Sequence, residues 1–236
     1  MSDPTDLRGY RRLYPGTQPD RIHLPYASTR LRGPGRDPIR MPATLSEVTG
    51  PTLDRITLGK HAADLTAGFK GQPLGERIVV SGRVLDENGR PVRNRVVEVW
   101  QCNAAGRYLH KGDQHDAPLD PNFTGTGQVL TDEHGRYRFT TIKPGAYPWR
   151  NHFNAWRPAH IHFSLHGEGI GQRLVTQMYF PGDPLLEFDP IYNCVDDAKA
   201  RARMVSSFDW ETTENEFALG YRFDIVLRGR KMTVWE

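Results

Sequence analysis

The stretch that decides the fold is RIVVSGRVLDENGRPVRNRVVEVW, residues 77–100. It contains two short runs rich in valine, residues 77–86 and 95–100, separated by a polar segment with glycine and proline. Valine and isoleucine favour strands, and Asn-Gly is a strong signal for a tight turn. The stretch therefore predicts two strands joined as a hairpin, with the turn at Asn88-Gly89.

The same texture continues toward the C-terminus. A second cycle consists of QVLTD, a turn at Glu133-His134-Gly135, and RYRFTTI, which ends before Lys143-Pro144-Gly145. Further strand-like runs are HIHFSLHG (160–167), RLVTQMYF (173–180) and YRFDIVLRG (221–229), with a loop expected at residues 167–171. Residues 196–208 have the composition of a longer helix. The spacing predicts a mainly β fold: an antiparallel β-sandwich with an extended N-terminal arm and one or two short helices.

The N-terminal part has a different character. Proline and glycine interrupt residues 1–43 so often that we expect extended coil without regular helix or strand, and TLSE at residues 44–47 has the spacing of a capping box that opens a short helix near residues 46–49. We divide the chain into an arm with a short helix, residues 1–75, and a sandwich, residues 76–236. Residues 1–40 contain eight arginines and four aspartates, but no dense basic run. A segment that wraps a partner subunit is favoured over a nucleic-acid arm.

Composition excludes several classes of protein. The 236 residues carry 31 basic and 28 acidic side chains, a formal charge of +3, so no large basic surplus calls for nucleic acid. The two cysteines, Cys102 and Cys194, are too few for a disulfide framework and are expected to be ordinary thiols. No run approaches the roughly 18 apolar residues of a membrane span, and residues 1–9 lack the apolar core of a signal peptide. We expect a cytoplasmic protein that does not bind membranes.

The most informative segment for chemistry is RPAHIHFSL, residues 157–165. Side chains alternate faces along a strand, so His160, His162 and Ser164 share one face while the apolar residues between them share the other. Two imidazoles two residues apart on a strand can bind one metal ion. Alone, an H-x-H pattern is more often a pair of hydrogen-bonded histidines than a metal site.

Two tyrosines are further candidates. Tyr147 lies in KPGAYPWR, where Pro144 and Gly145 turn the chain out of a strand, and Tyr108 lies in NAAGRYLH, directly after the strand ending at Trp100. Loops at strand ends are where functional residues are usually placed. Each tyrosine by itself is more often an amphipathic residue at the margin of a core. The interest lies in the joint pattern of two histidines and two loop tyrosines.

The chain resembles the intradiol aromatic-ring dioxygenases, and among them the iron-carrying subunit of the protocatechuate type. The likeness extends from about residue 26 to the end and is carried by GRVLDENGRPV, VEVWQCNAAGRY, DPNFTGTG, TDEHGRYRFTTIKPGAYPWR and WRPAHIHFSL. Cys102 departs from the family's usual alanine. The resemblance implies one non-haem Fe(III) per chain, Arg157 as a catalytic cation, and Tyr147 as the ligand that leaves when substrate binds. The implied iron ligands are Tyr108, Tyr147, His160 and His162, and the implied substrate-binding residues are Tyr26, Trp149, Gln177 and Ile191.

The chemistry of the donor set agrees with the implied metal. Two tyrosinates and a hydroxide balance the three charges of a ferric ion, and neutral imidazoles fill the remaining positions. Zinc more usually takes cysteine, histidine or carboxylate, and ferrous oxygenases take two histidines and one carboxylate. The implied reaction is the opening of a catechol ring by O2 between its two hydroxylated carbons. For protocatechuate the product is 3-carboxy-cis,cis-muconate, formed in the β-ketoadipate pathway of aromatic degradation.

Other assignments stay open at the level of sequence. The strand and turn pattern is also similar to transthyretin-like sandwiches, which are usually non-catalytic binding modules. Catechol and hydroxyquinol 1,2-dioxygenases share the ligand set but carry a helical N-terminal segment, which the proline-rich residues 1–43 do not suit. The resemblance also implies a homologous α subunit that lacks the iron ligands and completes the substrate pocket, with the arm as an intersubunit contact.

Overall fold

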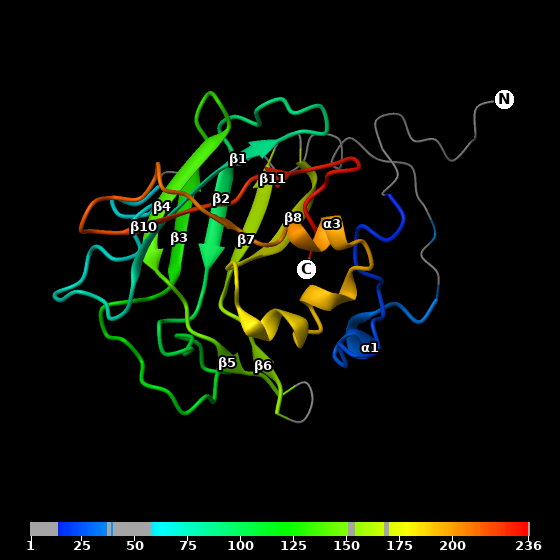
Figure 1. The fold of residues 1–236 in the computed structure, drawn as a ribbon, viewed down its shortest axis with the longest axis horizontal. Helices are drawn as coiled ribbons and strands as arrows, with labels where there is room; N and C mark the ends of the chain where they lie inside the picture. Colours follow the sequence, from blue (N-terminus) through cyan, green and yellow to red (C-terminus); the bar gives the residue numbers. More distant parts are fainter. Residues whose placement is uncertain (1–13, 37–38, 40–57, 151–153, 168–169, 236) are drawn as a thin grey trace.

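The computed structural model describes residues 14–36, 39, 58–150, 154–167 and 170–235. The helix predicted near residues 46–49 lies outside them. The fold is mainly β, as expected, with several antiparallel sheets and a few short helices (Figure 1). No helix within these described ranges is long and apolar enough to cross a membrane.

Two sheets and a small ribbon make up the architecture. The first sheet has five strands: β1 (Arg77–Leu85), β4 (Arg136–Ile142), β9 (Ser207–Phe208), β10 (Leu219–Arg222) and β11 (Ile225–Val226). The second has the order β3-β2-β7-β8: β3 (Thr126–Leu130), β2 (Val96–Trp100), β7 (His160–Gly167) and β8 (Ile170–Tyr179). The two-stranded ribbon consists of β5 (Tyr147–Pro148) and β6 (Trp156–Arg157). β1 pairs in antiparallel fashion with β4 but runs parallel to β10 and β11, a detail that the spacing of strands could not indicate.

The two predicted hairpins are wrong, because β1 and β2 belong to different sheets, and so do β3 and β4. β1 pairs with β4 and β10, whereas β2 pairs with β3 and β7. The chain reverses at Asp86, whose carboxylate accepts hydrogen bonds from the backbone N–H groups of Asn88 and Arg90. Gly89 follows with φ of 78°. Asp132 builds the same turn between β3 and β4, so both turns carry the chain from one sheet to the other.

The core lies between the sheets. Alternate residues of β1 and β7 meet there, and the largest fully buried side chains include Phe139, Phe163, Ile78, Ile161 and Leu165. The rings of Phe139 and Phe163 pack edge to face at 5.9 Å. Burial of one such side chain contributes about 1.5–3 kcal/mol. This packing fixes the apolar face of β7, and so determines which way its histidines point.

Several predicted elements are shorter than expected. Within residues 196–208 the helix is limited to the five residues of α3 (Ala198–Ala202), because Tyr179 of β8 exchanges backbone hydrogen bonds with Met204 and Ser206 and draws that segment out of the helix. Residues 221–229 are divided into β10 and β11, since the Asp224 carboxylate accepts from the Arg83 N–H. Strands β7 and β8 extend into the expected loop at 167–171.

The arm is not entirely coil. Residues 29–32 form one helical turn, α1 (Thr29–Arg32), where the Thr29 hydroxyl bonds the carbonyls of His23 and Tyr26. Figure 1 shows α1 in blue and α3 in orange on the same side of the strands. Between β8 and α3 lie two 3-10 turns, η1 (Pro184–Glu187) and η2 (Tyr192–Cys194).

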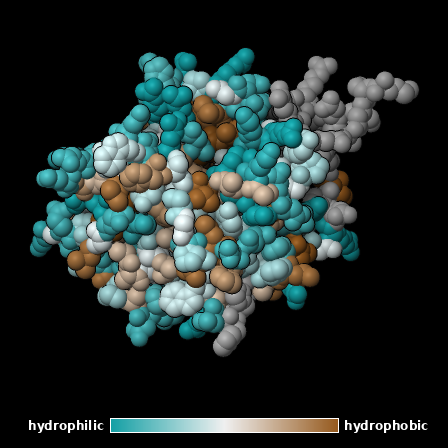
Figure 2. Space-filling model, viewed as in Figure 1, coloured by the Kyte–Doolittle hydropathy of each residue, from teal (hydrophilic) through white to brown (hydrophobic). Residues whose placement is uncertain are grey.

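Exposed apolar side chains gather at one edge of the first sheet. Figure 2 shows brown and tan side chains on the left of the view, where Figure 1 places β10. The exposed large side chains of β9, β10 and the loop between them are Phe208, Trp210, Phe217 and Leu219.

Candidate metal centre

The two histidines of β7 lie side by side on one face of the second sheet, as the strand alternation predicts. His160 and His162 are 1% and 8% exposed, and their ring centroids are 4.8 Å apart. The intervening Ile161 belongs to the core on the opposite face. Trp100, at the end of β2, stacks on the His162 ring at 4.8 Å with an interplanar angle of 3°. This stacking partner was not foreseen from the sequence, because only the β2–β7 register brings it opposite His162.

The structure brings both predicted tyrosines to these histidines. The Tyr108 Oη is 3.2 Å from His162 Nε2, and the Tyr147 Oη is 3.4 Å from His160 Nε2. The two phenol rings meet edge to face at 5.4 Å. The Tyr108 N–H is held by the Asp113 carboxylate at 2.8 Å, and Tyr147 lies on the ribbon strand β5. Two phenol oxygens and two imidazole nitrogens therefore converge on one place.

Two glycines allow the tyrosine loops to meet. Gly106 has φ of 79°, and a Cβ at this position would lie 2.3 Å from the Ala146 carbonyl oxygen. A Cβ at Gly145 would lie 2.4 Å from the carbonyl oxygen of Ala104. The backbone of the Tyr108 loop is thus in direct contact with that of the Tyr147 loop, at a separation that only glycine permits.

The protonation states suit a metal. His160 Nδ1 lies 2.7 Å from the Pro158 carbonyl, which can only accept, so Nδ1 carries the proton and Nε2 presents its lone pair to the site. Burial holds the pKa of His160 well below its usual range, and electrostatic interactions with Arg157 and His162 lower it further. The ring is therefore neutral. Burial raises the pKa of Tyr108 and of Tyr147, so each phenol needs a nearby cation to ionise. This donor set fits a hard, highly charged ion such as Fe(III).

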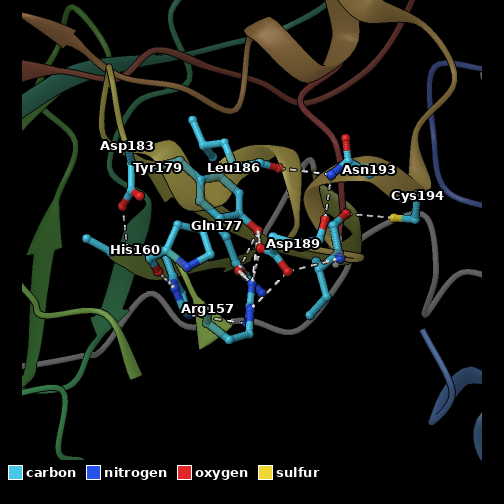
Figure 3. A network of polar contacts seen from close by, with 12 residues as sticks. Arg157, His160, Gln177, Tyr179, Asp183, Leu186, Asp189, Asn193 and Cys194 are labelled. Carbon is cyan, nitrogen blue, oxygen red and sulfur yellow. Dashed lines mark hydrogen bonds and ion pairs between the residues drawn. The ribbon is translucent and has the colours of Figure 1, made fainter. Parts of the chain in front are cut away.

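Arg157 is buried in a polar network beside His160 (Figure 3). It is 3% exposed and ion-paired with Asp189, which is fully buried; the Arg157 Nη2 to Asp189 Oδ2 distance is 2.9 Å. Nη2 also donates to Gln177 Oε1 at 2.5 Å and to Tyr179 Oη at 3.0 Å. Burial alone would lower the pKa of Arg157, but Tyr179 and Asp189 keep it well above its usual value. A permanent positive charge therefore lies beside His160.

The expected substrate contacts cluster near this charge. The Tyr26 ring packs edge to face on Trp149 at 5.2 Å, and the Trp149 ring centroid is 5.4 Å from the Arg157 guanidinium carbon. Ile191 is buried, and its N–H donates to Asp189 Oδ1 at 3.1 Å. Gln177 lies opposite His162 in the β7–β8 pairing. Its amide Nε2 is buried without a hydrogen-bond partner in the described part of the chain, so a donor remains available on this face.

Comparison with known proteins agrees with this geometry. Residues 48–229 match the sequence profile of a protein family described as "Dioxygenase". The chain belongs to the intradiol dioxygenase family, which uses non-haem iron. It is 60% identical over 238 residues to the protocatechuate 3,4-dioxygenase beta chain of Burkholderia cepacia, and the alignment covers all of both chains. The predicted family and enzyme class are confirmed, and the non-catalytic binding module is not supported.

More distant relatives place the chain within the family. The protocatechuate 3,4-dioxygenase alpha chain of Pseudomonas putida is 28% identical, over 90% of this chain and 96% of that one. The 6-chlorohydroxyquinol 1,2-dioxygenase of Cupriavidus pinatubonensis is 33% identical, over 71% of this chain and 58% of that one. The crystal structure of 3-chlorocatechol 1,2-dioxygenase from Rhodococcus opacus 1CP shares the fold, with a TM-score of 0.56 and 23% identity over 76% of this chain and 70% of that one.

Proposed function

We propose that this chain binds one Fe(III) through Tyr108, Tyr147, His160 and His162 and carries out the intradiol cleavage of protocatechuate to 3-carboxy-cis,cis-muconate. The observation that carries the proposal is the convergence of two phenol oxygens and two imidazole nitrogens next to a buried arginine. The full-length relative named for this activity supports the choice of substrate. The reaction adds both atoms of O2 to the ring carbons and belongs to the degradation of aromatic compounds.

When bound, ferric iron would hold the two catechol oxygens and draw electron density from the ring, which makes it reactive toward O2. The chain's own residues prepare this reaction. His160 is neutral and its Nδ1 is held by the Pro158 carbonyl, so its Nε2 presents a lone pair that would bind the metal. Tyr147 lies on a two-residue strand, where its oxygen can accept a catechol proton as the substrate enters. Tyr108, held through its backbone by Asp113, stays in place.

Arg157 and its neighbours then act on the substrate itself. The buried guanidinium provides a positive charge for the negative charge that develops as the ring reacts, and burial makes such a charge more effective than in water. Trp149, Tyr26 and Ile191 form apolar walls that exclude water from the ring. The buried amide nitrogen of Gln177 supplies a further donor for a bound oxygen.

The partner in this proposal is a homologous α subunit, as the names of the two related chains suggest. Residues 1–75 form the arm that contacts it, and residues 76–236 form the catalytic domain. Part of the arm packs on its own sandwich, because Gln18 bonds the backbone of Thr233 and Trp235. Its apolar side chains Leu31 and Ile39, at 92% and 89% exposed, remain for a partner to cover. The cytoplasmic location stays a prediction.

The test is oxygen uptake by the chain co-expressed with its α subunit and loaded with iron. Protocatechuate is expected to be consumed with one equivalent of O2, giving the tricarboxylic muconate identified by mass spectrometry. Catechol and hydroxyquinol serve as competing substrates. Faster turnover of either one would overturn the substrate assignment, and the absence of ring cleavage with all three would overturn the proposed function.

A further inference from the structure

The Asp189 carboxylate is fully buried and uses all four of its acceptor positions (Figure 3). Oδ1 accepts from Arg157 Nε at 3.2 Å and from the Ile191 N–H at 3.1 Å. Oδ2 accepts from Arg157 Nη2 at 2.9 Å and lies 2.9 Å from the Tyr179 hydroxyl. A carboxylate offers about four lone-pair sites, so this one is saturated.

The chain around Asp189, from Leu185 to Asn193, holds this residue rigidly. Its backbone N–H donates to the Leu185 carbonyl, and its own carbonyl accepts from both the backbone and the side chain of Asn193. Asp189 thus lies in a short loop tied down on both sides. A side chain so fixed can impose an orientation on a flexible partner such as arginine.

The orientation imposed on Arg157 is specific. Nε and Nη2 are occupied by Asp189, Gln177 and Tyr179, whereas Nη1 lies 3.4 Å from His160 Nε2, at the point where the four donor atoms converge. A two-point contact between guanidinium and carboxylate fixes the plane of the guanidinium as well as its position. Rotation of that plane would turn Nη1 away from the site.

We propose that Asp189 is a positioning residue: it holds the Arg157 guanidinium so that Nη1 faces the reacting ring, and it sets the Ile191 wall of the same pocket. The inference rests on the proposed function and adds to it a residue that does not touch substrate. It also gives a reason for burying a carboxylate here, because an arginine in this place without a counter-charge would be strongly destabilising.

The first test compares Asp189→Asn with Asp183→Asn in the iron-loaded complex with the α subunit. Asp183 is the matched control, because its carboxylate also ties the segment together, accepting from the N–H groups of Leu185 and Ala159, without touching Arg157. We expect Asp189→Asn to keep its iron content and visible absorption but to lose about 10²-fold in kcat, the loss that a misplacement of about 1 Å can cause. Asp183→Asn is expected to lower only the melting temperature.

The second test asks whether Asp189 acts through Arg157. Added guanidinium ion should restore part of the kcat of Arg157→Ala, since the vacated space keeps the acceptors of Asp189, Gln177 and Tyr179. It should fail to restore Arg157→Ala/Asp189→Asn, in which the buried pair is removed together and the fold is less perturbed than in either single variant. This comparison also decides the matter if Asp189→Asn alone does not fold.

The outcomes separate the two proposals. A wild-type complex that does not cleave catechols contradicts the proposed function. An active wild type, with Asp189→Asn equally active or with guanidinium rescue equal in both Arg157→Ala backgrounds, contradicts the positioning role.

Discussion

Replacing Gly106 with alanine should separate the two loops that carry the candidate tyrosine ligands. The position has φ of 79°, and the new Cβ would lie 2.3 Å from the Ala146 carbonyl oxygen and 3.2 Å from the Tyr147 Cβ. Since ordinary contacts begin near 3.4 Å, the Ala146–Tyr147 backbone must retreat by roughly 1 Å, a displacement that can cost about 10²-fold in activity. The Tyr147 oxygen would move away from His160.

The expected loss of stability in Gly106→Ala has two parts. The left-handed conformation costs a non-glycine residue about 1–2 kcal/mol, and overpacking against a fixed backbone costs about 1–3 kcal/mol. Gly89→Ala is the control that isolates the first part, because Gly89 has φ of 78° and nothing lies within 4 Å of its added Cβ. With about 2–4 °C per kcal/mol for a domain of this size, Gly106→Ala should melt roughly 4–20 °C lower and Gly89→Ala roughly 2–8 °C lower.

The assay is differential scanning calorimetry combined with iron determination on the same samples. Gly106→Ala is expected to melt below Gly89→Ala and to bind less iron, while Gly89→Ala keeps the iron content of the wild type. Equal melting temperatures and equal iron content in the two variants would refute the reasoning that the loops are in obligate contact at Gly106.

Three further predictions concern acid stability, thiol reactivity and the core. Hydrogen bonds from the Arg136 and His134 N–H groups lower the pKa of Asp132 in the folded protein. The ionised carboxylate therefore stabilises the fold fully above its unfolded pKa of about 3.9, and this stabilisation is lost as the pH falls through the lower folded pKa. Between about pH 5 and 3, the melting temperature of Asp132→Asn should depend less on pH than that of the wild type. Burial raises the pKa of Cys102 to about 12, so peptide mapping after iodoacetamide treatment at pH 8 should find Cys102 unmodified in the native protein and modified in urea. Phe163→Ala should cost about 3–5 kcal/mol in urea unfolding, and a loss below 1 kcal/mol would contradict its place at the centre of the core.

The parts of the site that sequence could predict are those set by local pattern. Strand alternation gave the shared face of His160 and His162, because a strand with a strongly apolar opposite face can pack only one way. The tyrosine loops were identified by the turn residues around them. The resemblance to a known family joined these local features into one set of candidate ligands.

The parts that sequence could not predict depend on contacts between distant segments. Asp189 lies 32 residues from Arg157, and nothing in its neighbourhood marks it as a counter-charge. Trp100 meets His162 only through the β2–β7 register. The helix expected over residues 196–208 is shorter for the same reason, because the second half of this range forms backbone hydrogen bonds with β8. Pairing between strands, including the parallel pairs of β1, likewise has no local signal.

The measurement that tests the central claim most directly is the visible absorption spectrum of the purified iron-loaded complex, with iron content determined on the same sample. Ionised Tyr108 and Tyr147 bound to Fe(III) should give a broad charge-transfer band near the middle of the visible range and a red-brown colour. Tyr108→Phe, which removes one of the two phenol oxygens, should weaken and shift this band, because only Tyr147 remains as a tyrosinate ligand. A wild-type protein that stays colourless and iron-free after reconstitution with ferrous salt in air would contradict the account.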